Sequence, residues 1–252
     1  MLGMYVSRIR PEMSPLPTEK AFFISSHGTR ITPTDFRIRL KDHFINYRTQ
    51  ARYFASRGFA VFVPVRVGYG ETGGPDVEES GNCNNRDYEF SYRVGGEQTR
   101  KVIALAKTKS FVDPARGVVV GQSFGGTLAV EVASGNIGGV VAVINFAGGG
   151  GGDPVGRPGR PCRPDRLENL FAAYGKSAKI PSLWLYSEND AYWGKKVPRE
   201  WFAAYTKSGA KAEFVQLAPV ETSSPAAGHL AFSRSMKEWR PHVKRFLASM
   251  GF

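Results

Sequence analysis

Short apolar runs and longer amphipathic stretches alternate along this chain. The short runs are rich in β-branched and aromatic residues and predict strands at 4–9, 21–26, 60–65, 118–120, 140–146, 182–187 and 213–217. The longer stretches repeat apolar residues at helical spacing and predict helices at about 36–57, 87–108, directly after residue 123, from about 165, at 198–208 and at 239–249. Strands that alternate with helices build a mostly parallel sheet with helices on both faces, so the pattern predicts an α/β fold.

Two segments interrupt this alternation. Residues 147–165 are rich in Gly and Pro and predict a long irregular segment, which is either a rim or lid over a site or a passive surface loop. Asp113–Arg116 predicts a turn that leads into the strand at 118–120. Neither segment is long enough to form a second domain, and the composition does not shift along the chain. We therefore expect a single domain over residues 1–252, with a small cap or none.

The composition fits one ordinary α/β domain, because the 252 residues are 42% hydrophobic and 22% charged. No stretch approaches the ~18 consecutive apolar residues that a membrane-spanning helix needs, so no membrane span is expected. The start of the sequence lacks the charged and apolar segments of a signal peptide. We therefore expect either a protein that stays inside the cell or a sequence that begins after processing.

The net charge of +12 raises the question of an anionic partner. The basic residues are scattered over several segments instead of forming a dense run, which favours a solvated basic surface over a specific nucleic-acid site. Non-specific, salt-sensitive binding to polyanions remains an open alternative. Gly68–Gly74 matches the letters of a dinucleotide-binding turn, but Pro75 and Gly81 follow where a helix would have to begin. We therefore expect no nucleotide cofactor.

Cys83 and Cys162 are the only two cysteines, and they lack the Cys-x-x-Cys spacing of a zinc or redox site. Both lie in loops rich in Gly, Asn, Pro and Arg, unlike the buried thiols of a typical core. We predict that they form one disulfide that pins two loops together. A disulfide would imply a periplasmic or secreted protein from which a signal has been removed, whereas free thiols would fit the cytoplasm.

The strongest chemical signal is the segment Val118–Val130. It combines a short apolar strand, the tight turn Gly-Gln-Ser-Phe-Gly at 121–125 and a helix of small and apolar residues. The glycines let the strand and helix backbones approach closely, so Ser123 is expected on an exposed turn above the sheet. The N–H of Phe124 then lies at the positive end of a helix, where an oxyanion can form. A Gly-rich turn with an incidental serine is the alternative.

A nucleophilic serine needs a base, and the base needs a carboxylate that holds it in the right tautomer. His229 follows the last strand in a loop and is the best candidate base. The other histidines fit packing or loop-ordering roles, since two lie in predicted helices and one beside the first Gly-rich loop: His43, His242 and His27. Asp190 stands just past the strand at 182–187, at the sheet edge where ligand sites form. Glu188 is its competitor, and we favour Asp190.

Taken together, these motifs resemble a known family. Gly-Gln-Ser-Phe-Gly-Gly at 121–126, Ser-His-Gly at 26–28, Arg-x-Gly-Tyr-Gly at 66–70 and Glu-Asn-Asp at 188–190 look like the α/β-hydrolase superfamily. The closest branch is its dienelactone-hydrolase-like and prolyl-oligopeptidase-like members, and the resemblance runs from about Ala21 onward. It implies a single-domain α/β-hydrolase fold.

The resemblance also implies roles for individual residues. Ser123 would be the nucleophile, Asp190 the orienting acid and His229 the general base. The oxyanion hole would be formed by the backbone N–H groups of Phe124 and Thr29.

Three features depart from the family pattern. Dienelactone hydrolases have Cys where this chain has Ser123, and the related peptidases usually carry a propeller domain for which this chain has no room. Only 26 residues precede the His-Gly pair, so we expect either a missing first edge strand or a trimmed start.

These residues predict a serine hydrolase that cleaves carboxylic esters through an acyl-enzyme, with a small-molecule ester as substrate and no metal or organic cofactor. Aromatic residues near the proposed catalytic loops are candidates for an apolar pocket: Tyr69, Phe124, Tyr192, Trp193 and Phe232. The alternatives are a small peptidase or amidase that uses the same residues, and a non-catalytic polyanion-binding protein on a hydrolase fold. The sequence leaves the acyl and alcohol groups and the oligomeric state open.

Overall fold

A mostly parallel sheet runs through the chain. The computed structural model describes residues 4–6, 20–26, 47–69, 72–221 and 224–252. Within this part of the chain the strands form a 7-stranded sheet in the order β1-β3-β2-β4-β5-β6-β7. The strands are β1 (Met4–Val6), β2 (Lys20–Ser26), β3 (Ala60–Pro64), β4 (Val112–Gln122), β5 (Val140–Phe146), β6 (Ser182–Ser187) and β7 (Ala212–Leu217). Strand β1 pairs antiparallel with β3, and the pairs from β3 to β7 are parallel, so their carboxyl ends share one edge.

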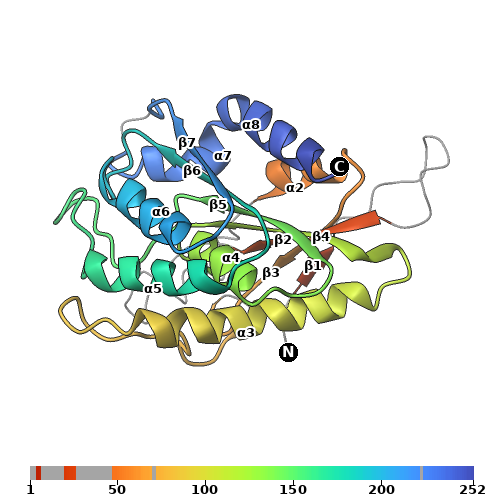
Figure 1. Cartoon of the computed structure of the whole chain (residues 1–252), viewed down its shortest axis with the longest axis horizontal. Helices are drawn as coiled ribbons and strands as arrows, with labels where there is room; N and C mark the ends of the chain where they lie inside the picture. The colour runs from red at the N-terminus through yellow and green to blue at the C-terminus, as the bar shows by residue number, and fades with distance from the viewer. Residues whose placement is uncertain (1–3, 7–19, 27–46, 70–71, 222–223) are drawn as a thin grey trace.

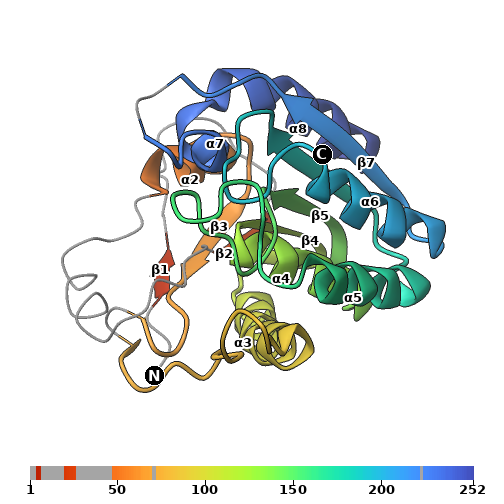
Figure 2. The same ribbon diagram turned by 90° about the vertical axis from the view of Figure 1, so that its left-hand side faces the viewer.

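Helices cover both faces of this sheet (Figures 1 and 2). One face carries α3 (Tyr88–Lys107), α4 (Phe124–Ser134), α5 (Pro164–Ser177) and α6 (Val197–Lys207). The other face carries α2 (Arg48–Ala55), α7 (Ala231–Arg234) and α8 (Met236–Ser249), with the short 3₁₀ turn η2 (Gly228–Leu230) just before α7. The predicted α/β architecture, with helices on both faces, is therefore confirmed.

The strand pattern explains how one sheet supports two cores. In β4, Val118 and Val120 point into the core under α2 and α8, whereas Val119 points into the core under α3 and α4. In β6, Leu183 and Trp184 divide between the two cores in the same way. Because neighbouring residues of a strand face opposite sides, a strand buried on both faces must be apolar throughout, which accounts for the uninterrupted apolar runs.

The structure differs from the sequence prediction in three places. The turn expected at Asp113–Arg116 lies within β4, where the pairing with β2 shifts between Asp113 and Gly117 and the intervening residues are exposed. The strand absorbs these residues as a bulge, which bends it without ending it. His229 lies in η2 and not in an irregular loop. The closing helix α8 begins at Met236, before the expected start at Trp239. Residues 36–46, the first part of the helix expected at 36–57, lie outside the described residues.

Trp239 is the centre of the core under α2 and α8. Its side chain is fully buried and its ring stacks on Phe54 at 6.2 Å between centroids. The rings of Phe146 and Phe232 contact it at 5.3 and 5.7 Å, and its indole N–H donates a hydrogen bond of 3.0 Å to the carbonyl of Phe232. One side chain therefore joins α2, α7, α8 and the sheet.

We expect Trp239→Ala to lower the free energy of unfolding by about 3–5 kcal/mol, because it removes a large buried side chain and leaves a cavity. Urea denaturation of the variant and the wild type measures this change. Phe90→Ala is the control, since Phe90 is 40% exposed on α3, and its effect should stay below about 1 kcal/mol. Equal losses in the two variants would contradict the assignment of Trp239 as the organising side chain of this core.

Candidate active site

Ser123 stands at the sharp turn between β4 and α4. Its backbone has φ 57° and ψ −125°, a conformation that residues with a Cβ rarely adopt. A Cβ at Gly121 would overlap the carbonyl of Gly125, so this strand and helix approach one another at a distance only glycine permits. The N–H of Ser123 donates a 2.9 Å hydrogen bond to the carbonyl of Phe146 in β5, which holds the turn over the sheet. The side chain remains partly exposed.

The residue after Ser123 presents a backbone donor. Phe124 is the first residue of α4, and its N–H makes no hydrogen bond with any described residue. An unpartnered N–H at a helix N-terminus, beside a potential nucleophile, suits the stabilisation of an oxyanion. Thr29, the second predicted donor, lies outside the described residues.

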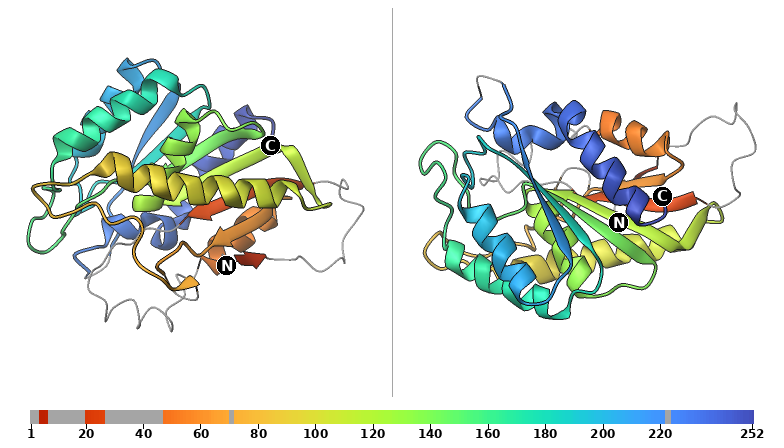
Figure 3. Two further views of the ribbon diagram at one scale, coloured as in Figure 1. Left: turned by 90° about the horizontal axis from the view of Figure 1, so that it is seen from below. Right: turned by 45° about the horizontal axis from the view of Figure 1, so that its top comes forward.

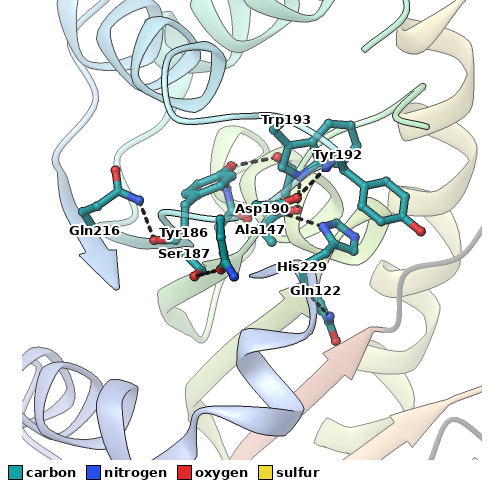
Figure 4. Close-up of polar contacts among 12 residues, drawn as sticks. Gln122, Ala147, Tyr186, Ser187, Asp190, Tyr192, Trp193, Gln216 and His229 are labelled. Atoms are coloured by element: carbon teal, nitrogen blue, oxygen red, sulfur yellow. Dashed lines mark hydrogen bonds and ion pairs between the residues drawn. The ribbon is translucent and has the colours of Figure 1, made fainter. Parts of the chain in front are cut away.

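Asp190 and His229 form a buried hydrogen-bonded pair (Figure 4). The His229 Nδ1 lies 3.0 Å from Asp190 Oδ2, and the side chains are 8% and 0% exposed. The other carboxylate oxygen of Asp190 accepts a 2.8 Å hydrogen bond from the N–H of Tyr192, which fixes its orientation. A Cβ at Gly228 would overlap the backbone of Asn189 and Asp190, so the glycine before His229 permits this contact.

Two aromatic rings hold the imidazole of His229. Tyr192 stacks on it with ring centroids 4.0 Å apart, and Trp193 meets it edge-on at 5.5 Å. Trp193 is itself fixed, because its indole N–H donates a 2.8 Å hydrogen bond to the carbonyl of Ala147 (Figure 4). Burial raises the pKa of Tyr192, so its phenol stays neutral beside the imidazole. These contacts restrict the ring to one orientation.

Gln122 connects the serine turn to the histidine. Its side-chain amide donates a 2.6 Å hydrogen bond to the backbone carbonyl of His229. The amide oxygen accepts a 2.8 Å hydrogen bond from the Tyr47 hydroxyl, just before α2. The Ser123 hydroxyl makes no direct hydrogen bond to His229, and catalytic hydrogen bonds of this kind commonly tighten only when substrate binds. Gln122 therefore joins the two segments through buried groups, and sequence reasoning gave it no role.

The competing acid and base are placed elsewhere. Glu188 points to the surface, where its carboxylate pairs with Lys195 at 3.1 Å. His242 lies within α8. His27 and His43 lie outside the described residues. The structure thus brings Asp190 and His229 together, and it gives Glu188 a different partner.

The predicted pocket residues divide into three groups. Tyr192 and Trp193 contact His229, as described above. Tyr69 and Phe124 are largely buried, and the buried guanidinium of Arg66 lies over both rings, 5.0 and 4.8 Å from their centroids. Phe232 is 1% exposed and packs against Tyr47, Phe146 and Trp239, so it belongs to the core and not to a substrate surface. Its position three residues after His229 made it look like a pocket residue, but α7 turns its ring inward.

Arg66 is held by a buried ion pair beside this aromatic group. Its Nε lies 3.1 Å from a carboxylate oxygen of Glu78, and the two side chains are 2% and 1% exposed. Burial by itself lowers the pKa of Arg66, but the Glu78 carboxylate and Tyr69 outweigh it and raise that pKa above its ordinary value. Burial also raises the pKa of Tyr69. The positive charge of Arg66 is therefore retained next to Phe124.

The irregular segment that follows β5 packs beside these residues. The hydroxyls of Tyr92 and Tyr88 on α3 donate hydrogen bonds of 2.9 and 3.0 Å to the carbonyls of Gly149 and Gly150. Cys162 at its far end is joined by a disulfide to Cys83 in the loop before α3, with the Cα atoms 5.0 Å apart. A role as a rim or lid over the site stays a prediction.

No group of three or more metal-ligating side chains gathers among the residues that the structure describes. Within the same residues, no helix combines the length and apolar character needed to cross a membrane.

Comparison with known proteins gives a family and a fold. A family model described as "Alpha/beta hydrolase family" matches residues 22–250. A thermophilic esterase from Thermogutta terrifontis with bound propionate is similar over 100% of this chain and 90% of its own, at 18% identity and a TM-score of 0.58. No curated protein matches the sequence.

Two further solved structures share the fold. A putative dienelactone hydrolase from Klebsiella pneumoniae is 14% identical, with 100% of this chain and 99% of the other covered and a TM-score of 0.57. A puromycin-hydrolysing peptidase from Mycobacterium tuberculosis is 13% identical, with 94% of this chain but 36% of the other covered and a TM-score of 0.57. At these identities the likeness concerns the fold alone.

Thiol counting tests the cysteine pair. We expect no free thiol after denaturation without reductant, and we expect the double variant Cys83→Ser, Cys162→Ser to lose about 2–5 kcal/mol of stability, because the bridge closes a long loop. Ser134→Ala, which removes a hydroxyl that donates to the carbonyl of Glu131, is the control for a single small substitution that leaves both cysteines in place. Two titratable thiols in the denatured, unreduced protein would disprove the pairing.

Proposed function

Because this chain belongs to the alpha/beta hydrolase family, we propose that it is a serine hydrolase that cleaves carboxylic esters through an acyl-enzyme. The observation that carries this proposal is the buried Asp190–His229 pair beside the strained turn of Ser123. A carboxylate that accepts the Nδ1 proton of a histidine leaves its Nε2 free to act as a base. A base of this kind is what a serine hydroxyl needs in order to act as a nucleophile.

The proposed reaction has two halves. Ser123 Oγ attacks the ester carbonyl carbon while His229 Nε2 takes the hydroxyl proton, and the N–H of Phe124 donates to the oxyanion of the tetrahedral intermediate. Collapse of this intermediate breaks the carbonyl–oxygen bond to the alcohol, which leaves with the proton held by His229. Water then attacks the acyl-Ser123 ester with His229 as base, and the carboxylic acid and free serine are released.

Asp190 acts through His229. Its carboxylate stabilises the imidazolium that forms in each half-reaction, and the Tyr192 N–H keeps the carboxylate aligned. The aromatic rings of Tyr192 and Trp193 hold the imidazole in place and exclude water from one side of it.

An amide substrate is the second candidate, since the same groups cleave amides and one structural neighbour is a peptidase. Esters are favoured because the likeness to that peptidase covers only 36% of its chain, whereas 90% of the esterase chain is covered. Aryl and alkyl esters assayed beside short peptide amides separate the two substrate classes.

We expect Ser123→Ala to reduce kcat for ester hydrolysis by at least about a thousandfold and to abolish labelling by a fluorophosphonate probe, because the nucleophile is removed. Initial rates on 4-nitrophenyl esters of increasing acyl length, together with probe labelling, provide the measurement. Ser134→Ala is the matched control, since that hydroxyl bonds within α4 to the carbonyl of Glu131, and it should retain activity. Labelling that persists in a folded Ser123→Ala protein would contradict the proposal.

We expect Gln122→Leu to lower kcat about tenfold with little change in KM, because the variant keeps the side-chain volume but removes the donor to His229. Tyr47→Phe should have a smaller effect, since it removes only the hydroxyl that donates to the side-chain oxygen of Gln122. The donor from Gln122 to His229 stays in place. Steady-state kinetics and thermal unfolding of both variants separate positioning of the base from loss of stability. An unchanged kcat in a folded Gln122→Leu protein would rule out this positioning role.

A further inference from the structure

A shallow groove lies between α2 and α8, and the catalytic scheme makes no use of it. Its volume is about 530 Å³, within the range of small-molecule sites. Its lining comprises Thr49, Arg52, Tyr53, Ser56, Arg57 and Arg240. Positions 49, 52, 53 and 56 repeat at helical spacing, so they share one face of α2 and the turn that follows it. Figures 1 and 3 show α2 beside α8, which supplies Arg240.

The groove concentrates positive charge. Three of its lining residues are arginines and none is acidic. Arg52, Arg57 and Arg240 form no ion pair with any residue in the described part of the chain. Like charges that share a groove repel one another, and a bound anion relieves that repulsion.

Tyr53 orders two of these arginines. The Arg57 guanidinium carbon lies 4.2 Å from the centroid of the Tyr53 ring, and that of Arg240 lies 4.8 Å from it. The ring is 8% exposed and packs edge-on against Trp239 and Phe54, so it forms a fixed platform. Side chains ordered in advance lose less conformational freedom when a ligand binds.

The guanidinium donors of this groove differ from those of other arginines that lie on aromatic rings. Arg199 lies over Phe214 but donates to the side chain of Gln216, and Arg93 lies over Phe90 but pairs with Glu97. Arg52 and Arg57 donate to no described acceptor, and the sole contact of this kind for Arg240 is a long one of 3.9 Å to the sulfur of Met236. The groove therefore keeps most of its N–H donors free for a ligand.

We propose that this groove is a binding site for a small molecule that carries a phosphate or sulfate group. Planar guanidinium groups match the oxygen atoms of such groups with paired, charge-assisted hydrogen bonds. The hydroxyl of Thr49 adds a neutral donor on the same wall, whereas the hydroxyl of Ser56 donates to the carbonyl of Tyr53 at 2.9 Å. The site is separate from the proposed ester-cleaving residues, so anion binding can be tested independently of ester hydrolysis.

Isothermal titration calorimetry with inorganic phosphate, pyrophosphate and sulfate, at low ionic strength in a zwitterionic buffer, tests the site. We expect the wild type to bind at least one of these anions, and we expect R52Q, R57Q and R240Q each to weaken binding about tenfold, as for loss of one charged hydrogen bond. R93Q is the matched control: it removes the same charge from a ring-stacked arginine outside the groove, and its affinity should equal that of the wild type. The separate anions show which oxyanion the site prefers.

Two results would overturn the proposal. One is the absence of heat from all three anions with the wild type. The other is an equal loss of anion affinity in R93Q and in the groove variants, which would show that the affinity comes from the overall charge of the protein and not from this groove. R52Q keeps the test decisive even if R57Q or R240Q unfolds, because Arg52 does not stack on Tyr53. Hydrolysis of a 4-nitrophenyl ester by R52Q, measured without phosphate, should match the wild type and distinguishes a failed anion site from a failed enzyme.

Discussion

The candidate site depends on how closely β4 and α4 approach at the turn of Ser123. Gly121 lies against the carbonyl of Gly125, and Gly126 lies against the side chain of Asn145 in β5. The positive φ of Ser123 costs on the order of 1–3 kcal/mol, so the surrounding packing has to stabilise it. Fully buried Asn145 contributes, since it donates a 3.2 Å hydrogen bond to the Tyr186 hydroxyl, which in turn donates to the carbonyl of Gly148 at 2.7 Å. The serine turn is thus supported by two neighbouring strands.

Asp190 and His229, the candidate acid and base, are positioned by backbone contacts as well as by their own hydrogen bond. Gly228 brings η2 against the segment that carries Asp190, and the Tyr192 N–H fixes the carboxylate. The carbonyl of His229 accepts from Gln122, which precedes Ser123. Buried hydrogen bonds of this kind are costly to break, because each partner would be left without an alternative in a dry interior. The geometry of the site therefore follows from the fold.

Ser123, Asp190 and His229 could be proposed as catalytic residues from the sequence because their signals are local and ordered. Each follows a strand with a recognisable apolar pattern, and their order along the chain matches the order associated with a strand-turn-helix nucleophile. The positioning role that we propose for Gln122 was not predictable, since it depends on where its side-chain amide points, which is set by the packing of α2 and η2.

The misplaced residues have physical explanations of the same kind. Phe232 was assigned to the pocket from its nearness to His229 in sequence, but the direction of its ring is set by α7 and by Trp239. Asp113–Arg116 has the composition of a turn, yet β4 pairs with β2 before and after these residues and accommodates them as a bulge. Helix α2 has two faces with different consequences: Tyr47 and Gln50 at its inner side hydrogen-bond to Gln122 and to the carbonyl of Phe232, whereas Arg52 faces the groove. An eight-residue helix is not stable alone, so both faces depend on the packing of Tyr53 and Phe54 against Trp239.

This shared dependence on α2 does not couple the groove to the candidate active site. A ligand affects a distant site only when it binds two arrangements of the protein with different affinities. As long as Trp239 holds α2 in one position, an anion in the groove would have no second arrangement to select, so we expect the proposed anion site and the candidate catalytic residues to act independently.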